Sequence, residues 1–378
     1  MTQDTISAIS TPIGPGAIGV LRLSGPKAHE ILSAIFVPKK KGPLRPFSLR
    51  LGNIVDPDTG DKLDEVLVSI MKAPYSYTRE DMAEIQSHSG IGILISILEL
   101  TLRLGARPAQ PGEFTYRAFL NGRLDLPQAE AVMDLVQTPS KKGQSMALNA
   151  LMGKLSEKVD SVRERLLEAL SFLEALIEFP EEELGIDLSL TFLPLKDLIP
   201  EMEELIEAHR SRRIWFEGIY VVIAGRTNAG KSSLLNRLIQ SPRAIVTPLP
   251  GTTRDLLEVP YLLEGIPVKL VDTAGIGVPK DEAEEMGIER AMESIEAADV
   301  IIYVVDQSVG VREEDISVIR SHAQNTVVTL NKADLPRSIS VENIEKMLPE
   351  GVPYAFVSAL TGFGIGELKG KIKEKVLC

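Results

Sequence analysis

The strongest chemical signal in the sequence is a glycine-rich run that ends in a lysine and a serine. Residues 225–232 read GRTNAGKS, which fits the phosphate-loop pattern G-x-x-x-x-G-K-[ST]. Glycines allow consecutive backbone N–H groups to turn toward phosphate oxygens. Lys231 can neutralise the β- and γ-phosphates of a nucleotide, and the Ser232 hydroxyl can bind Mg²⁺. A strand-like stretch precedes the run and an apolar helical stretch follows it, so we expect a phosphate site rather than an ordinary glycine-rich turn.

Two further motifs each follow an apolar, strand-like stretch. The sequence DTAG begins at Asp272, which can hold Mg²⁺ through water, and ends at Gly275, whose N–H can contact a γ-phosphate. The sequence NKAD runs from Asn331 to Asp334. The Asp334 carboxylate can accept two hydrogen bonds from the N1–H and amino groups of guanine, a donor pair that adenine lacks. Asn331 and the aliphatic part of Lys332 would shape the base pocket.

Two more segments complete the nucleotide motifs. Ser358-Ala359-Leu360 follows the last strand-like stretch and is expected to close the base pocket through its backbone. Between the first two motifs, residues 247–255 read TPLPGTTRD, where either Thr252 or Thr253 could complete the coordination of Mg²⁺. The order and spacing of all these segments predict a GTPase rather than an ATPase.

The elements that must position these motifs fall into three regions, from which we expect a multidomain α/β protein. Residues 1–120 mix strand-like stretches with an apolar helix at 91–104, which indicates an α+β domain. Residues 121–216 carry a helical apolar stripe, continuous from Leu148 to Ile177, and a second stripe from Leu195 to Ile206. Residues 217–378 alternate strands and helices, which is typical of a mostly parallel sheet. The expected strands there are 219–224, 267–271, 300–305, 326–330 and 353–357.

Composition limits the remaining possibilities. The 378 residues carry 41 Lys and Arg against 53 Asp and Glu, a net charge of −12 that argues against gripping nucleic acid by bulk charge. A local basic patch remains compatible with this balance. The single cysteine, Cys378, excludes an intrachain disulfide. The apolar runs are strand-sized and the N-terminus lacks the pattern of a signal peptide, so we expect a cytoplasmic protein with no membrane segment.

Beyond the nucleotide motifs, the chain resembles the MnmE (TrmE) family of tRNA-modifying GTPases over nearly its whole length. The resemblance is carried by residues 4–25, by PGEFTYRAFLNGRLDL at 111–126, by QAEAV at 128–132 and by GTTRD at 251–255. It implies a folate-binding-like dimerisation domain (1–120), an incomplete helical domain (121–216) and a Ras-like G domain (217–378). The motifs and the resemblance together imply a set of GTP-binding residues: Asn228, Ala229, Gly230, Lys231, Ser232, Ser233, Thr247, Thr252, Thr253, Asp272, Thr273, Ala274, Gly275, Asn331, Lys332, Asp334, Ser358, Ala359 and Leu360.

The resemblance also implies how GTP would be hydrolysed. The family uses K⁺ in place of an arginine finger, and its G domains pair across a homodimer. The K⁺ ligands would be Asn228, Thr247, Leu249 and Thr252, whereas Ser232 and Thr253 would hold Mg²⁺. Ile276 stands where Ras-like GTPases carry a water-orienting glutamine. The family pattern points to Glu284 as the catalytic residue for that task, beside Lys231, although an acidic run at 281–285 is also typical of a solvated helix start.

For the first domain, the resemblance implies a site for 5-formyl- or methylene-tetrahydrofolate. Arg22 and Glu80 match binding positions, and Arg123 stands where the family carries lysine. Without the resemblance, the favoured interpretation of Arg22 is a charged residue on an exposed strand face. The family acts with an FAD-dependent partner, MnmG, in a heterotetramer that adds an aminomethyl-type group to C5 of the wobble uridine of certain tRNAs.

One difference from the family leaves alternatives open. Its members continue past the G domain with further helices and a Cys-x-Gly-Lys end, whereas this chain ends at Cys378. We therefore expect the 148–206 stripe, otherwise a helix-on-helix core, to find another partner, stay exposed or pack loosely. The competing hypotheses are a truncated GTP- and folate-binding dimer without modification activity, and a ribosome-assembly GTPase of the Era/Der kind.

Overall fold

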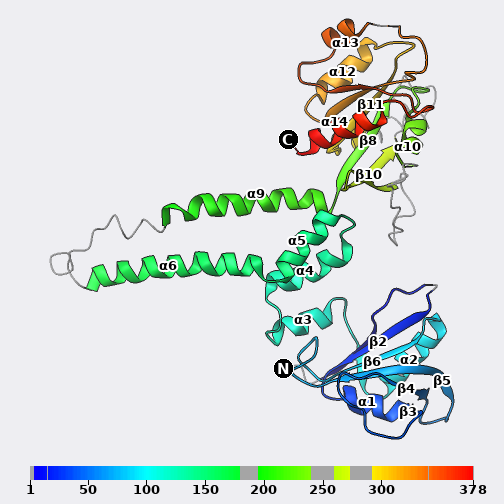
Figure 1. The fold of residues 1–378 in the computed structure, drawn as a ribbon, viewed down its shortest axis with the longest axis vertical. Helices are drawn as coiled ribbons and strands as arrows, with labels where there is room; N and C mark the ends of the chain where they lie inside the picture. The colour runs from blue at the N-terminus through cyan, green and yellow to red at the C-terminus, as the bar shows by residue number, and fades with distance from the viewer. Residues whose placement is uncertain are drawn as a thin grey trace. The chain divides into compact units, whose positions relative to one another are not determined.

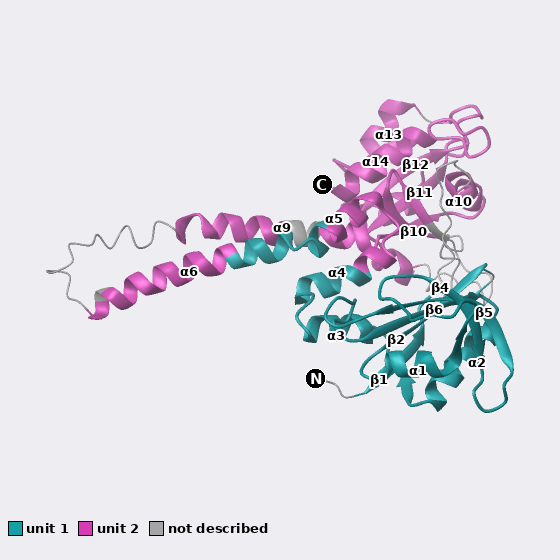
Figure 2. Ribbon diagram, turned by 60° about the horizontal axis from the view of Figure 1, so that its bottom comes forward, with its two compact units in different colours: residues 1–133, 149–160 teal, residues 134–148, 161–378 magenta. Residues whose placement is uncertain are grey.

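The computed structural model describes residues 4–14, 16–178, 195–239, 259–272, 292–338 and 340–377. The chain divides into two compact units (Figure 2): residues 1–133 with 149–160, and residues 134–148 with 161–378. The first unit contains a seven-stranded sheet and the second a six-stranded, mostly parallel sheet with helices on both faces. This confirms the multidomain α/β class. The residue boundaries of the three expected domains remain a prediction.

Alternating apolar residues build the first unit. Its sheet runs, in spatial order, β3 (Phe36–Pro38), β4 (Arg50–Val55), β5 (Lys62–Met71), β6 (Met82–His88), β2 (Ile18–Ser24), β1 (Thr5–Ile9) and β7 (Ala106–Pro108). Every second residue of β5, namely Val66, Val68 and Ile70, joins one buried cluster with Leu21 and Leu23 of β2. Helices α1 (Ala28–Ile35) and α2 (Ile91–Arg103) contribute buried residues to the same cluster, so both cover the same face of the sheet (Figure 1).

Helical segments follow the first sheet. They are α3 (Glu113–Leu120), α4 (Leu126–Gln137), α5 (Lys141–Leu151), α6 (Lys154–Glu178) and, beyond a gap in the described residues, α9 (Leu198–Phe216). The prediction of one continuous helix from 148 to 177 is wrong, because Gly153 adopts a left-handed φ of +85° between α5 and α6. The predicted break at 180–187 lies outside the described residues. Leu195 precedes α9 rather than belonging to it.

The apolar stripe on these helices is not a buried core in this chain. Figure 1 shows α6 and α9 side by side, and Arg165 of α6 forms an ion pair with Glu201 of α9 at 3.1 Å. Of the stripe residues, Leu166 and Leu170 are half-exposed and Ile177 is 86% exposed. The helix-on-helix core interpretation is therefore wrong for these three residues. Other stripe residues, such as Val162 and Leu173, are partly buried, and Leu198 of α9 is buried.

The second unit has the doubly wound arrangement that the alternating pattern predicted. Its sheet runs β13 (Tyr354–Phe356), β12 (Thr326–Asn331), β11 (Val300–Asp306), β8 (Ile219–Gly225), β10 (Ile266–Asp272) and β9 (Val259–Leu263), with only β9 antiparallel to its neighbour. Val221 and Ile223 of β8 belong to one buried cluster, and Val222 and Ala224 belong to another on the opposite face. These two clusters confirm the five predicted strands as core elements buried on both faces.

Helices cover both faces of this sheet in the described residues. Helices α10 (Lys231–Ile239) and α14 (Ile365–Leu377) contribute to the cluster around Val221, whereas α12 (Glu313–Ser321) and α13 (Val341–Met347) contribute to the cluster around Val222. The strand order reverses at β8, because β10 lies on one side of it and β11 on the other. Ligands of such sheets bind at this point, outside the carboxyl ends of the strands.

We expect core and stripe substitutions to differ in their effect on stability. Leu234→Ala removes a fully buried side chain and should lower the free energy of unfolding of the second unit by about 2–5 kcal/mol. The double variant Leu166→Gln, Leu170→Gln changes half-exposed positions and should stay within about 0.5 kcal/mol of wild type. The single tryptophan, Trp215, lies in the cluster around Val221, so its fluorescence during urea unfolding reports on both variants. A glutamine double variant as destabilised as Leu234→Ala would contradict the exposed stripe.

Candidate nucleotide-binding site

The phosphate loop follows β8 at the carboxyl edge of the second sheet. Asn228 and Gly230 have left-handed φ values of +63° and +94°. A Cβ at Gly230 would lie 2.2 Å from Nδ2 of Asn331, so only glycine allows the two loops to approach this closely. Lys231 is buried and donates hydrogen bonds from Nζ to the carbonyls of Gly225 and Arg226, both at 3.0 Å. These two hydrogen bonds hold the Lys231 ammonium against the phosphate loop. A bound phosphate would have to replace them.

Helix α10 begins at Lys231, and this start gives the loop its electrostatic character. Ser232 and Ser233 are exposed in its first turn. Unpaired N–H groups at a helix N-terminus carry partial positive charge and favour anions. Asp272 ends β10, where it pairs with Ile223 of β8 in a parallel register, so its backbone lies on the strand beside the loop.

Asn331 joins the phosphate loop to the candidate base pocket. Its side chain is buried at the end of β12, donates from Nδ2 to the Ala229 carbonyl at 2.9 Å and accepts from the Ala359 N–H at Oδ1 at 3.1 Å. The Ser358 hydroxyl donates to Oδ1 of Asp334 at 2.5 Å. The structure thus brings Asn331, Asp334 and the 358–360 segment together, as the motif spacing predicted.

Two residues that the sequence analysis did not single out hold this pocket. Asp306, at the end of β11, pairs its Oδ2 with Nζ of Lys332 at 2.5 Å. Desolvation raises the pKa of Asp306, but hydrogen bonds from Lys332 and Ser308 together outweigh it, so the pKa is lowered. Arg237 of α10 donates from Nε to the Ala359 carbonyl at 2.8 Å and from Nη2 to the Leu360 carbonyl. Asp306 follows an apolar strand, which is a signal readable in the sequence, whereas Arg237 contacts a segment 122 residues away and carries no such signal.

A cavity of about 270 Å³ lies beside the phosphate loop and is lined in part by Asn228, Asp306 and Lys332. Within the described residues, no group of three His, Cys, Asp or Glu side chains could hold a metal ion. Hydroxyl and amide oxygens of the Ser232 and Asn228 type fit Mg²⁺ and K⁺, which prefer oxygen ligands. Several predicted site residues lie outside the described residues: Thr247, Leu249, Thr252, Thr253, Thr273, Ala274, Gly275 and Glu284.

The predicted folate residues surround the 77–80 segment of the first unit. Arg22 of β2 lies directly opposite Glu84 of β6 and binds its carboxylate at 2.7 Å, with the guanidinium 5.8 Å from the Tyr77 ring. Arg123 lies 4.7 Å from the same ring and donates to the Tyr77 carbonyl at 2.9 Å. Tyr77 therefore links two arginines that lie 101 positions apart in the chain, and the sequence analysis missed it.

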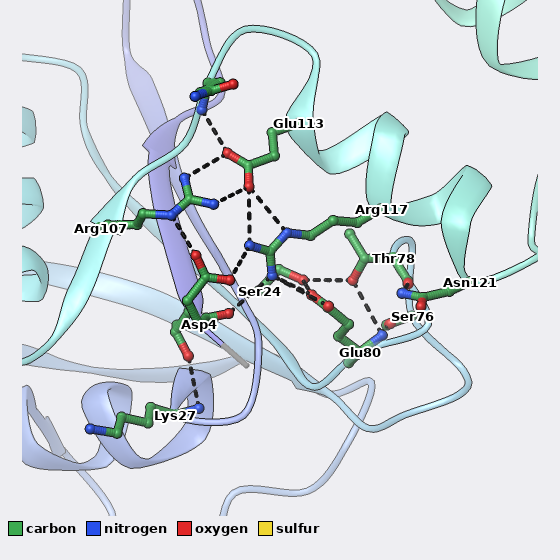
Figure 3. A network of polar contacts seen from close by, with 12 residues as sticks. Asp4, Ser24, Lys27, Ser76, Thr78, Glu80, Arg107, Glu113, Arg117 and Asn121 are labelled. Carbon is green, nitrogen blue, oxygen red and sulfur yellow. Dashed lines mark hydrogen bonds and ion pairs between the residues drawn. The ribbon is translucent and has the colours of Figure 1, made fainter. Parts of the chain in front are cut away.

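Glu80 is fixed by a network of charges centred on the buried Arg117 (Figure 3). Its Oε2 accepts from the Ser24 hydroxyl at 2.7 Å and from Nη1 of Arg117 at 3.1 Å. Arg117, which is 1% exposed, also contacts Asp4 at 2.9 Å and Glu113 at 3.1 Å. A buried guanidinium needs such partners, because an uncompensated buried charge is strongly destabilising. The structure thus brings together Arg123, the Tyr77 ring, the oriented carboxylate of Glu80, and Arg22 with its partner Glu84.

Comparisons with known proteins find relatives of both units. Residues 5–123 match the family model described as GTP-binding protein TrmE N-terminus, and residues 220–332 match the model described as 50S ribosome-binding GTPase. A protein named tRNA modification GTPase MnmE from Syntrophobacter fumaroxidans is 46% identical over the whole of this chain and 82% of its own length. Proteins of the same name from Carboxydothermus hydrogenoformans and Moorella thermoacetica are 46% and 44% identical, over 89% and 100% of this chain and 74% and 83% of their own.

The charge network predicts a pH-dependent stability of the first unit. The hydrogen bond from Arg107 lowers the pKa of Glu113 from 4.5 to about 2. Stabilisation by the ionised carboxylate is therefore complete above about pH 4.5 and is lost as the pH falls toward 2. Glu113→Gln should lower the free energy of unfolding by about 3 kcal/mol at pH 7 and by less than about 1 kcal/mol near pH 2.5.

Hydrogen exchange of peptides from β1 and α3, followed by mass spectrometry between pH 7 and 2.5, measures this difference. The control is Glu99→Gln, at an exposed position on α2. If Glu113→Gln lowers the free energy of unfolding by the same amount at every pH, the lowered pKa of Glu113 is not the cause of the loss.

Proposed function

The chain belongs to the MnmE family of tRNA modification GTPases, and on that premise we propose that its second unit binds and hydrolyses GTP at the carboxyl edge of the six-stranded sheet. The observation that carries this proposal is the Asn331 side chain, which ties the phosphate loop to the Asp334 and Ala359 loops. These contacts would hold the proposed phosphate-binding loop and the proposed guanine pocket at a fixed distance from each other before a nucleotide binds.

In the proposed mechanism, the phosphates lie on the loop N–H groups and on the start of α10. Lys231 moves its ammonium from the Gly225 and Arg226 carbonyls to the β- and γ-phosphates. Asp334 reads the guanine edge, and Asp306 keeps Lys332 in place beside the pocket. Glu284 is proposed to orient the attacking water. Ser232 and Thr253 would hold Mg²⁺, which offsets phosphate charge.

We further propose that K⁺ binds at Asn228, Thr247, Leu249 and Thr252 and that two G domains pair to complete the site. The left-handed backbone and exposed side chain of Asn228 support this role, because its amide oxygen is free to turn toward the phosphates. A cation there would stabilise negative charge developing in the transition state.

The first unit is proposed to bind a tetrahydrofolate derivative and to form the homodimer. Arg22 and Arg123 would contact the glutamate carboxylates and Glu80 the pterin. Exposed Val37, Leu51 and Leu67 on adjacent strands support an interface between copies.

The proposed role of the whole chain is in adding a carboxymethylaminomethyl-type group to C5 of the wobble uridine of certain tRNAs. It would act in the cytoplasm, in a heterotetramer with an MnmG-type flavoprotein. No helix in the described ranges is long and apolar enough to cross a membrane. The relatives named for tRNA modification match residues of both units, which favours this role over ribosome assembly.

GTP turnover in matched potassium and sodium buffers tests the proposed hydrolysis. We expect turnover to be at least tenfold faster in K⁺ and to rise faster than linearly with protein concentration, because pairing of G domains is second order. Asn228→Ala should abolish the difference between the cations, with GTP affinity measured separately so that a loss of binding is not taken for a loss of K⁺ dependence. Equal turnover rates in the two buffers would contradict the role of K⁺. A rate proportional to protein concentration would contradict the pairing of G domains.

Binding of 5-formyltetrahydrofolate, measured by calorimetry, tests the first unit. Arg123 is exposed, so Arg123→Ala should preserve the fold and lower affinity about tenfold through loss of a charged hydrogen bond. Arg123→Lys should lose less, because it keeps the charge but not the planar fork. Lys154→Ala, an exposed cation on α6, is the control. Equal affinities for wild type and Arg123→Ala would refute the site.

A further inference from the structure

The connection between β3 and β4 carries a concentration of positive charge that neither proposed site uses. Residues 36–55 contain Lys39, Lys40, Lys41, Arg45 and Arg50 and no acidic residue, in a chain of net charge −12. Lys39 forms an ion pair with Glu65 of β5. Lys40, Lys41 and Arg45 are each exposed to solvent.

The backbone of this connection is held from within. Arg50, the first residue of β4, donates from Nη2 to the carbonyls of Lys40 and Lys41 at 2.8 and 3.3 Å. A Cβ at Gly42, where φ is +144°, would lie 2.9 Å from the same nitrogen, so glycine admits the guanidinium. The Ser48 hydroxyl donates to the Arg45 carbonyl at 2.6 Å. The three exposed cations therefore project from a fixed backbone.

An aromatic side chain lies within the same segment. Phe47 is 65% exposed and has a left-handed φ of +58°, a conformation that is rare for bulky residues. Its N–H donates to the Ile70 carbonyl at 2.9 Å, which places it beside the end of β5. The exposed residues Lys72 and Tyr75 follow Ile70 in the chain. The fold thus holds an apolar ring in water, two residues after Arg45 in the chain, in an unfavourable backbone conformation.

We propose that Lys40, Lys41, Arg45 and Phe47 form a contact surface for single-stranded RNA. The cations would bind phosphates and the Phe47 ring would stack on a base, which is how proteins bind unpaired nucleotides. An acidic protein would satisfy the charges but not the ring, so the combination favours RNA. This inference rests on the proposed function in tRNA modification, and it assigns part of the tRNA contact to this chain despite its acidic balance.

Fluorescence anisotropy with a labelled tRNA transcript, unmodified and with uridine at the wobble position, tests the surface at several salt concentrations. The triple variant Lys40→Ala, Lys41→Ala, Arg45→Ala should bind at least tenfold more weakly at low salt and reduce the slope of log affinity against log salt by about 2. Phe47→Ala should bind about tenfold more weakly with the slope unchanged, because stacking releases no counterions.

The matched control removes three exposed lysines elsewhere, with Lys154→Ala, Lys158→Ala and Lys346→Ala, and should bind like wild type. Circular dichroism checks that every variant is folded. If both surface variants bind RNA as tightly as wild type, the inference is refuted. If they also lose binding to the flavoprotein partner, the surface contacts that protein instead of RNA.

A reconstituted modification reaction separates this inference from the proposed function. If the wild-type chain and both surface variants modify tRNA at equal rates, the surface is refuted and the proposed function stands. If the wild-type chain hydrolyses GTP but neither binds nor modifies tRNA, the proposed function fails together with the inference.

Discussion

The side chain of Asn331 fixes the geometry on which the nucleotide site depends. One amide group donates to the Ala229 carbonyl of the phosphate loop and accepts from the Ala359 N–H. Both groups are buried, so losing the side chain would leave two backbone polar groups unsatisfied, at a cost of about 1–3 kcal/mol each. The Asn331 side chain occupies the space that a Cβ at position 230 would need, so only glycine fits there. The two loops therefore constrain each other's sequences.

A comparable constraint organises the first unit. Arg117 is buried among Asp4, Glu80 and Glu113, which come from the N-terminal segment, from the connection between β5 and β6 and from α3. The guanidinium can be buried only because these carboxylates converge on it. The same contacts orient Glu80. The network that stabilises the buried Arg117 therefore also positions a residue proposed to bind the ligand. Function in this unit is therefore coupled to its fold.

The sequence predicted those parts of the structure that depend on local pattern. The strands of the second unit and the loop positions of Asn331 and Asp334 follow from periodicity and motif spacing, because a parallel sheet brings strand ends to one edge. The helix break at Gly153 was missed, since the apolar period continues through it on both sides. Exposure was one of three outcomes expected for the stripe, and the period alone could not select it, because burial depends on partners that the period does not specify. Tyr77 and Arg237 were missed because they act across long sequence separations.

The central claim is that this edge of the sheet is a guanine-specific nucleotide site. Titration of the wild-type chain and of Asp334→Asn with fluorescent GTP, ATP and xanthosine triphosphate tests it most directly. Xanthine carries a carbonyl where guanine carries its amino group, so an asparagine amide can pair with it. We expect wild type to prefer GTP over ATP by at least about 100-fold, and Asp334→Asn to exchange GTP for the xanthine nucleotide. Equal affinity of wild type for GTP and ATP, or a variant that still prefers GTP, would contradict the account.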